Sequence, residues 1–135
     1  MTDGSVEQGL EHHLHTTGIH EFVFHESSHR IVDVWLSHTT AIAKTTPSTT
    51  IVRYLLVYSS KDMLPLMHVF SRLQKLIREM PDRHYTRVAV MHQPNFMVSI
   101  AQLFIKALGT GDKDRVRFFS LDDREAAVAW LLRDD

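Results

Sequence analysis

The chain has 135 residues, a length typical of one domain that can bury its own hydrophobic core. It contains no cysteine, which excludes disulfides, thiolate catalysis and thiolate metal sites. Fifteen Lys and Arg against sixteen Asp and Glu leave a net charge near zero, so we expect neither nucleic acid nor an anionic membrane surface as a partner.

Residues 1–18 carry few large apolar side chains and no sustained periodicity, which predicts a flexible arm attached loosely to the domain. This arm is rich in histidine, and His12, His13 and His15 could hold a zinc, nickel or copper ion through their imidazoles. The alternative is a disordered polar segment, because flexible histidines must be ordered before they bind. The first ten residues lack the features of a secretory signal, and no apolar run approaches the roughly 20 residues of a membrane span, so we expect a cytoplasmic protein.

The remainder, residues 19–135, is expected to form a single α/β domain, because short β-rich runs alternate with segments of helical periodicity. The almost uninterrupted apolar run at 51–58 is typical of an interior parallel strand. Regular alternation requires crossover connections, which predicts a single layer of four or five mainly parallel strands with helices on both faces. The expected elements in chain order are a strand at 21–25, a helix at 28–43, a strand at 51–58, a helix at 63–80, a strand at 87–92, a helix at 94–108, a strand at 115–119 and a last helix opened by the capping pair Ser120 and Asp123.

Three stretches of the second half follow the pattern of a known family. They are the buried strand 53–58, the strand 87–91 and the ending 116–119, which is followed by a helix with alanines just before Trp130 and Leu131. Over residues 51–135 the chain resembles the STAS-like domains related to anti-sigma factor antagonists, often described as SpoIIAA-like. The resemblance implies an α/β layer that recognises a protein partner or a small ligand and is not itself an enzyme.

Regulatory domains similar to the anti-sigma factor antagonists carry a turn of the type Asp-Ser-(Ser/Thr)-Gly, in which a serine is phosphorylated at a helix start. This chain has Ser59, Ser60, Lys61 and Asp62 at that place, without the glycine or the preceding aspartate. The departure puts a phosphorylation switch in doubt. Ser59 or Ser60 still precedes a helix N-terminus that would favour a phosphate.

The residues 25–29 spell HExxH, the signature of zinc hydrolases in which two histidines bind the metal and the glutamate activates water. That geometry requires one continuous helix, whereas the strand pattern before His25 and the capping serines before His29 place the two histidines on different elements. A downstream third ligand is also missing. A metal-dependent hydrolase using His25, Glu26 and His29 is therefore kept only as an alternative function.

Polar side chains follow each expected strand. Because the carboxyl ends of parallel strands meet at one edge of a sheet, and ligands collect there, these side chains form a candidate site for a small anionic ligand. The alternative is that they cap the helices that begin at that edge. The candidate residues are His25, Ser59, Ser60, His92, Gln93, Asn95 and Ser120.

The leading hypothesis is a non-enzymatic, STAS-like regulatory or ligand-binding module without a cofactor, which uses this edge or a helical face. A structural subunit of a homo-oligomer is a further alternative. Helices that cover a sheet normally keep their outer faces polar, yet Leu64, Val69, Met97 and Val98 lie off the main apolar stripes of two helices. This excess of apolar side chains predicts self-association, most simply as a twofold dimer.

Overall fold

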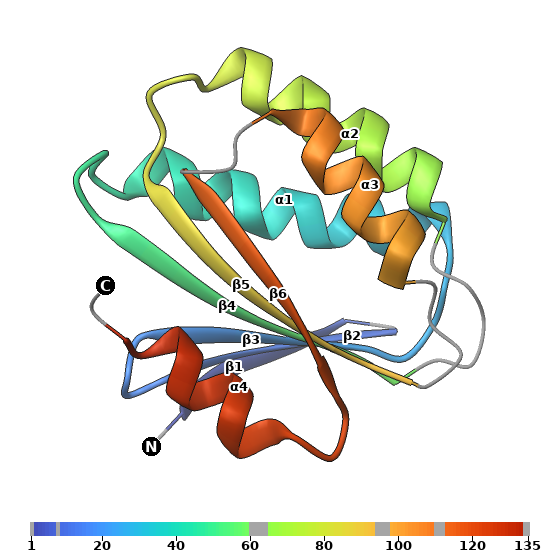
Figure 1. Cartoon of the computed structure of the whole chain (residues 1–135). Coiled ribbons are helices and arrows are strands. Elements are labelled where there is room, and N and C mark those ends of the chain that lie inside the picture. Colours follow the sequence, from blue (N-terminus) through green and yellow to red (C-terminus); the bar gives the residue numbers. More distant parts are fainter. Residues whose placement is uncertain (1, 8, 60–64, 94–97, 110–112, 134–135) are drawn as a thin grey trace.

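The computed structural model describes residues 2–7, 9–59, 65–93, 98–109 and 113–133, which form an α/β domain (Figure 1). One sheet holds six strands in chain order, with two antiparallel pairs at its start and parallel pairing from β3 to β6. The mainly parallel layer is as expected, but it has more strands than the expected four or five. The strands are β1 Thr2–Glu7, β2 Leu10–His15, β3 Ile19–Phe24, β4 Ile51–Tyr58, β5 Tyr85–His92 and β6 Asp114–Ser120.

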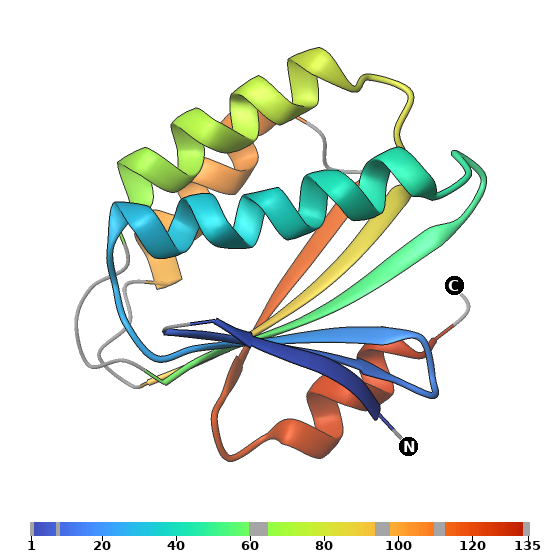
Figure 2. The same ribbon diagram turned by 180° about the vertical axis from the view of Figure 1, so that it is seen from behind.

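Helices cover both faces of the sheet (Figures 1 and 2). Three of them connect successive parallel strands, and each new strand is added on the same side of the previous one. Since such crossovers are right-handed, all three helices must lie on the same face. The last helix follows β6 and packs against the opposite face. The helices are α1 His29–Thr45, α2 Leu66–Glu79, α3 Val98–Leu108 and α4 Arg124–Leu131.

The N-terminal segment corrects the expectation of a flexible arm over residues 1–18. β1 and β2 form an antiparallel hairpin, and β2 pairs along its length with β3. Strand alternation places Leu10 in the core at 2% exposure, and the ring of His12 stacks on Phe22 with 4.4 Å between centroids. A histidine thus takes the place of an apolar side chain, which is why the segment lacks an apolar pattern.

The sheet separates two hydrophobic cores. Under the three crossover helices, Phe22, Phe24, Tyr54 and Tyr58 pack against the inner face of α1. On the other face, Trp130 and Leu131 of α4 pack against side chains of β3 to β6. We call the second cluster the α4 core; its buried members are Ile19, Leu55, Ala89, Met91, Phe119, Ala127, Trp130 and Leu131.

Two arginines of the sheet hold the end of α4. Nε of Arg53 donates to the carbonyl of Leu131 at 2.6 Å, and Nη1 of Arg87 donates to the carbonyl of Arg133. The last carbonyls of a helix have no partner within the helix and carry its negative dipole end. Arg53 therefore satisfies a carbonyl of the last turn of α4, and Arg87 holds the chain just beyond the helix.

Two apolar side chains expected on the outer faces of α2 and α3, Val69 and Val98, are not exposed. Val69 packs against the core under α1, because its side of α2 faces inward, and Val98 is half-buried. Leu64 and Met97 lie outside the described residues. The large apolar side chains exposed on these helices are Met67 at 70% and Leu103 at 66%. Within the described ranges, no helix is long and apolar enough to cross a bilayer.

Candidate functional site: an apolar cavity with a polar end

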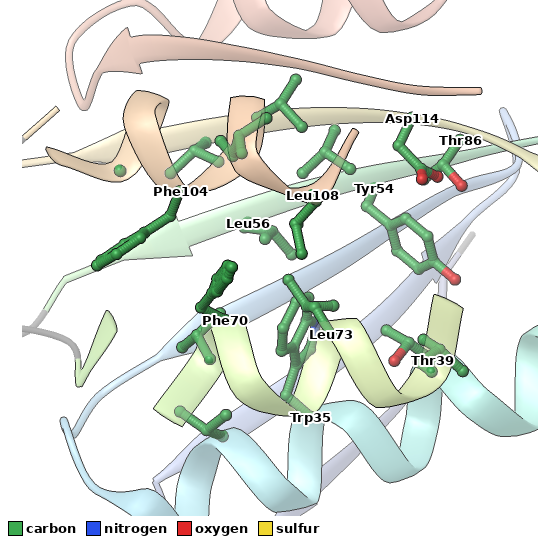
Figure 3. A pocket seen from close by; sticks show the side chains of 18 of the residues that line it. Trp35, Thr39, Tyr54, Leu56, Phe70, Leu73, Thr86, Phe104, Leu108 and Asp114 are labelled. Carbon is green, nitrogen blue, oxygen red and sulfur yellow. The ribbon is translucent and has the colours of Figure 1, made fainter. Parts of the chain in front are cut away.

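A cavity of about 210 Å³ lies between the sheet and the three crossover helices (Figure 3). α2 bounds the cavity on one side, and none of residues 66–79 is fully buried. The apolar stripe of α2, with Phe70 and Leu73 at its centre, faces this space together with Phe104 of α3. Leu56 and Val88 of the sheet form the opposite wall. The walls are almost entirely apolar, which suits an apolar ligand and disfavours a strongly hydrated one.

Polar side chains line one end of the cavity. Figure 3 shows Thr39, Tyr54, Thr86 and Asp114 gathered there, whereas Phe70 and Phe104 lie toward the other end. This polar end, which Arg83 and His84 complete, lies at the amino ends of β5 and β6.

The polar end is close to electrically neutral. Nη2 of Arg83 donates to Oδ2 of Asp114, and their side chains are only 6% and 18% exposed, so the two charges offset each other. Burial lowers the pKa of His84, although the hydrogen bond to the Tyr85 carbonyl opposes this effect, so the ring is neutral at pH 7. Burial also raises the pKa of the Tyr54 hydroxyl, which therefore stays protonated.

Two buried polar atoms of residues that line this cavity have no hydrogen-bond partner among the described residues, and neither atom is itself accessible from the cavity. They are Nε1 of Trp35, a donor, and Nε2 of His84. Buried polar groups are normally paired, and an unpaired one costs about 1–3 kcal/mol.

The polar edge expected from the sequence lies elsewhere, at the carboxyl ends of the strands. Ser59 Oγ lies 3.4 Å from Nδ1 of His25, and Nε2 of Gln93 donates to the Ser59 carbonyl at 3.3 Å. His92 instead places its ring edge against Phe118, which lines the cavity, and its Nδ1 donates to the Gln93 carbonyl at 2.8 Å. Ser120 Oγ accepts from the amide of Asp122 in the turn before α4, and Asp123 makes no capping bond with its side chain. Ser60 and Asn95 lie outside the described residues.

Glu11 joins this edge from β2, a residue that the sequence reasoning missed because it assigned the segment to a flexible arm. One carboxylate oxygen pairs with Nε2 of His25 and the other with Nε2 of His13 at 3.1 Å, and these hydrogen bonds lower the pKa of Glu11. The order Glu11, His25, Ser59 is that of a hydrolytic triad. However, Ser59 Oγ donates to the Phe24 carbonyl at 2.8 Å, so its proton is not directed to His25. The arrangement ties the hairpin to β4 and presents no activated nucleophile.

The candidate metal ligands are distributed over several places. β3 ends at Phe24 and α1 begins at His29, with the Ser28 hydroxyl accepting from the amide of Ile31, so HExxH does not lie on one helix. The ring of His29 stacks on that of His68. On β2, alternation turns His12 toward Phe22, while His13 and His15 pair with Glu11 and Glu21 on the other face. The described part of the chain contains no group of three side chains arranged to hold a metal.

Comparisons with protein-family models, with curated proteins and with solved structures each find no match for this chain. The resemblance to STAS-like domains over residues 51–135 therefore stays a prediction. The functional proposal is therefore based on the cavity and its polar end alone.

Proposed function

We propose that this domain is a ligand-binding module that holds a small, largely apolar molecule in the cavity between the sheet and helices α1 to α3. The observation that carries the proposal is an almost entirely apolar space of about 210 Å³ whose one polar end holds the paired charges of Arg83 and Asp114. The proposal retains ligand binding without chemistry, as the STAS-like resemblance implies. It moves the ligand from the carboxyl edge of the sheet to the cavity.

The energetic cost of an empty cavity supports an occupant. At about 24 cal/mol for each Å³ of closed cavity, 210 Å³ corresponds to a loss of about 5 kcal/mol. This value is an upper bound because part of the cavity opens to solvent. It is nevertheless comparable to the whole stability of a small domain, about 5–15 kcal/mol. A ligand that fills the space would recover much of this loss.

The size of the cavity limits the ligand. A dry apolar cavity of about 150 Å³ is enough to bind benzene, so 210 Å³ has room for a molecule of about two rings or a chain of similar volume. A cofactor the size of a dinucleotide does not fit. The ligand class is therefore a small hydrophobic compound.

The test uses N-phenyl-1-naphthylamine, a neutral two-ring probe that becomes fluorescent in apolar surroundings. A Trp130→Phe background removes the tryptophan of the α4 core and leaves Trp35, on the cavity wall, as the single tryptophan. We expect saturable binding of one probe per chain, energy transfer from Trp35 to the probe, and a rise in Tm with probe concentration.

The decisive variant is Val88→Phe, which places a larger side chain in the cavity from the centre of β5. It should abolish probe binding while it keeps or raises Tm, because it fills space that is empty in the wild type. Ala126→Leu, on the exposed side of α4, adds apolar volume outside the cavity and should leave binding unchanged. Probe binding that survives Val88→Phe, or no binding to the wild type, would refute the proposal.

A further inference from the structure

Strand β6 forms one open edge of the sheet (Figure 1). It spans Asp114–Ser120, and among the described strands it pairs only with β5. The free side of an edge strand carries backbone N–H and C=O groups that another extended chain can pair with. This edge is therefore a candidate docking site, and its side chains determine which chain it accepts.

The pairing with β5 shows which residues of β6 direct their backbone outward. The Thr86 amide donates to the Lys113 carbonyl at 2.9 Å, and Thr86 pairs with Asp114 in parallel register. In a parallel pair a residue bonds to the two neighbours of the residue opposite it. Lys113, Arg115 and alternate residues onward therefore direct their backbone toward β5. Val116, between them, directs its own N–H and C=O away from β5.

The side chains of β6 form two rows of different character. Arg115 and Arg117 are exposed and lie on the face of α4, the face into which Phe119 packs. The guanidinium of Arg117 lies 5.5 Å from the centroid of the Phe119 ring, which keeps the charge close to the strand. On the opposite face Val116 and Phe118 are half-buried. One row of the edge is thus cationic and the other is apolar.

Lys113 extends the cationic row just before β6. Its Nζ donates to the Pro81 carbonyl at 3.2 Å and lies 5.4 Å from the centroid of the Tyr85 ring. The one acid of β6, Asp114, belongs to the other row and pairs with Arg83. From residue 113 to residue 119 the row on the face of α4 therefore carries three cations and no acid.

This charge pattern disfavours a second copy of the chain as the occupant of the edge. Two copies of β6 that pair antiparallel about a twofold axis bring residues of the same row opposite each other. In every register centred on one of residues 113–117, a cation faces a cation. Like charges directly opposite each other destabilise a strand pair, whereas acidic side chains at the same positions would stabilise it.

We propose that β6 binds an extended acidic segment of another protein, which adds to the sheet as an antiparallel strand. The segment alternates acidic side chains, which face Arg115 and Arg117, with apolar side chains, which extend the row of Val116 and Phe118. Because the backbone of Val116 points outward, the apolar residues of the segment exchange hydrogen bonds with β6, and its acidic residues direct their amides away. The inference does not depend on the ligand of the cavity.

The test uses a fluorescently labelled peptide of alternating glutamate and valine, about as long as β6. One control peptide has lysine in place of glutamate, and a second has the same composition with the glutamates grouped at one end. Fluorescence anisotropy should show saturable binding of the alternating glutamate peptide, at least about tenfold tighter than that of either control. Absence of saturable binding to the wild-type protein would overturn the inference.

Methylation of the peptide backbone tests strand pairing on the unmodified protein. N-methyl groups on the valines remove the donors directed at β6 and should weaken binding at least about tenfold. N-methyl groups on the glutamates alter amides that point away from β6 and should change the affinity by less than about threefold. Binding that survives both modifications would show that charge alone holds the peptide, and the inference would be wrong.

Variants assign the charge preference to β6. Arg115→Glu combined with Arg117→Glu should bind the lysine peptide and no longer the glutamate peptide, because the opposite charges are exchanged. The matched control combines Lys75→Glu with Arg78→Glu, two exposed positions of α2, and changes the net charge by the same amount. It should keep the wild-type preference, and an equal loss in both variants would contradict the assignment. A fall in the mass of the wild-type protein on addition of the glutamate peptide, measured by light scattering, would show that a second copy occupies the edge and would also overturn the inference.

Discussion

Arg53 shows how a charged side chain is accommodated inside a sheet. Its guanidinium reaches across to α4 and donates to the Leu131 carbonyl, which otherwise has no partner within the helix. Arg53→Met keeps much of the length of the side chain but removes the donor. We expect the free energy of unfolding to fall by about 1–3 kcal/mol in urea denaturation, the cost of an unpaired group at a partly buried position.

The control for Arg53→Met is Arg78→Met. Arg78 is exposed in the last turn of α2, so its replacement should change stability by less than about 0.5 kcal/mol. A comparable effect of the two substitutions would show that the hydrogen bond to α4 contributes nothing.

A half-buried histidine, His20, and a buried one, His84, make stability depend on pH. Burial lowers the pKa of His20 below its usual 6.5, with a smaller contribution from His84, and burial lowers the pKa of His84 as well. Groups facing them include His12 and Tyr54 beside His20, and Asp114 beside His84. Because the unfolded chain binds protons that the folded chain does not, acid favours unfolding. The neutral histidines contribute their full stabilisation of the folded state above about pH 6.5. This stabilisation is lost as the pH falls from 6.5 to the lowered pKa values.

Urea denaturation at several pH values measures this effect. The free energy of unfolding should decrease between about pH 7.5 and pH 5, and it should decrease less in His84→Phe, which cannot take up the proton. If stability is constant across this range, or if the variant follows the wild type, the two histidines do not control it.

At the level of single residues, the sequence predicts part of what the structure shows and misses the cavity. His25, Ser59 and Gln93 lie together, because the ends of parallel strands meet at one edge whatever the details of packing. The cavity could not be foreseen in this way. Periodicity tells which face of α2 is apolar but not how far that face stands from the sheet.

The N-terminal hairpin is an integral element of the sheet. Leu10 is 2% exposed and packs with Phe24 across the β2–β3 pair, whereas Leu14 on the same strand is 36% exposed. Leu10→Ala should cost about 2–5 kcal/mol and Leu14→Ala less than about 1 kcal/mol, because only the first leaves a cavity. Deletion of residues 1–17 should destabilise the domain at least as much as Leu10→Ala.

Thermal and urea denaturation of the three variants measures these costs. A deletion that leaves stability unchanged would restore the idea of a loosely attached arm. Equal effects of the two leucine substitutions would place both side chains in the same environment, against the observed register.

Elements were predictable where local sequence and burial agree. The expected strand at 51–58 coincides with β4, because a strand buried on both faces is mostly apolar, and here Arg53 is the charged exception. β2 was missed because its core-facing positions include His12, and because Glu11, His13 and His15 on the other side are all polar. The signal that could have found it is the pair of glycines, Gly9 and Gly18, which adopt positive φ in the turns on either side of β2.

Self-association of the whole molecule stays a prediction, but the residues expected at the interface are different ones. Met67 of α2 and Leu103 of α3 are the exposed large apolar side chains on the two helices expected to form the interface. We expect light scattering at micromolar concentration to give the mass of two chains. Met67→Glu or Leu103→Glu should give a folded monomer, while Leu132→Glu beyond α4 should remain a dimer. A wild-type mass of one chain would contradict the prediction.

The cavity also has a consequence for molecular volume. Unfolding removes the empty space inside a protein, so its volume decreases, typically by about 20–100 mL/mol, and the decrease scales with the void that is lost. A domain of 135 residues with about 210 Å³ of void should lie toward the upper end of this range. Hydrostatic pressure should then unfold the ligand-free protein readily, beginning at α2 and α3, while α4 and its core on the other side of the sheet respond later. An occupant of the cavity would make the domain less compressible on one face only.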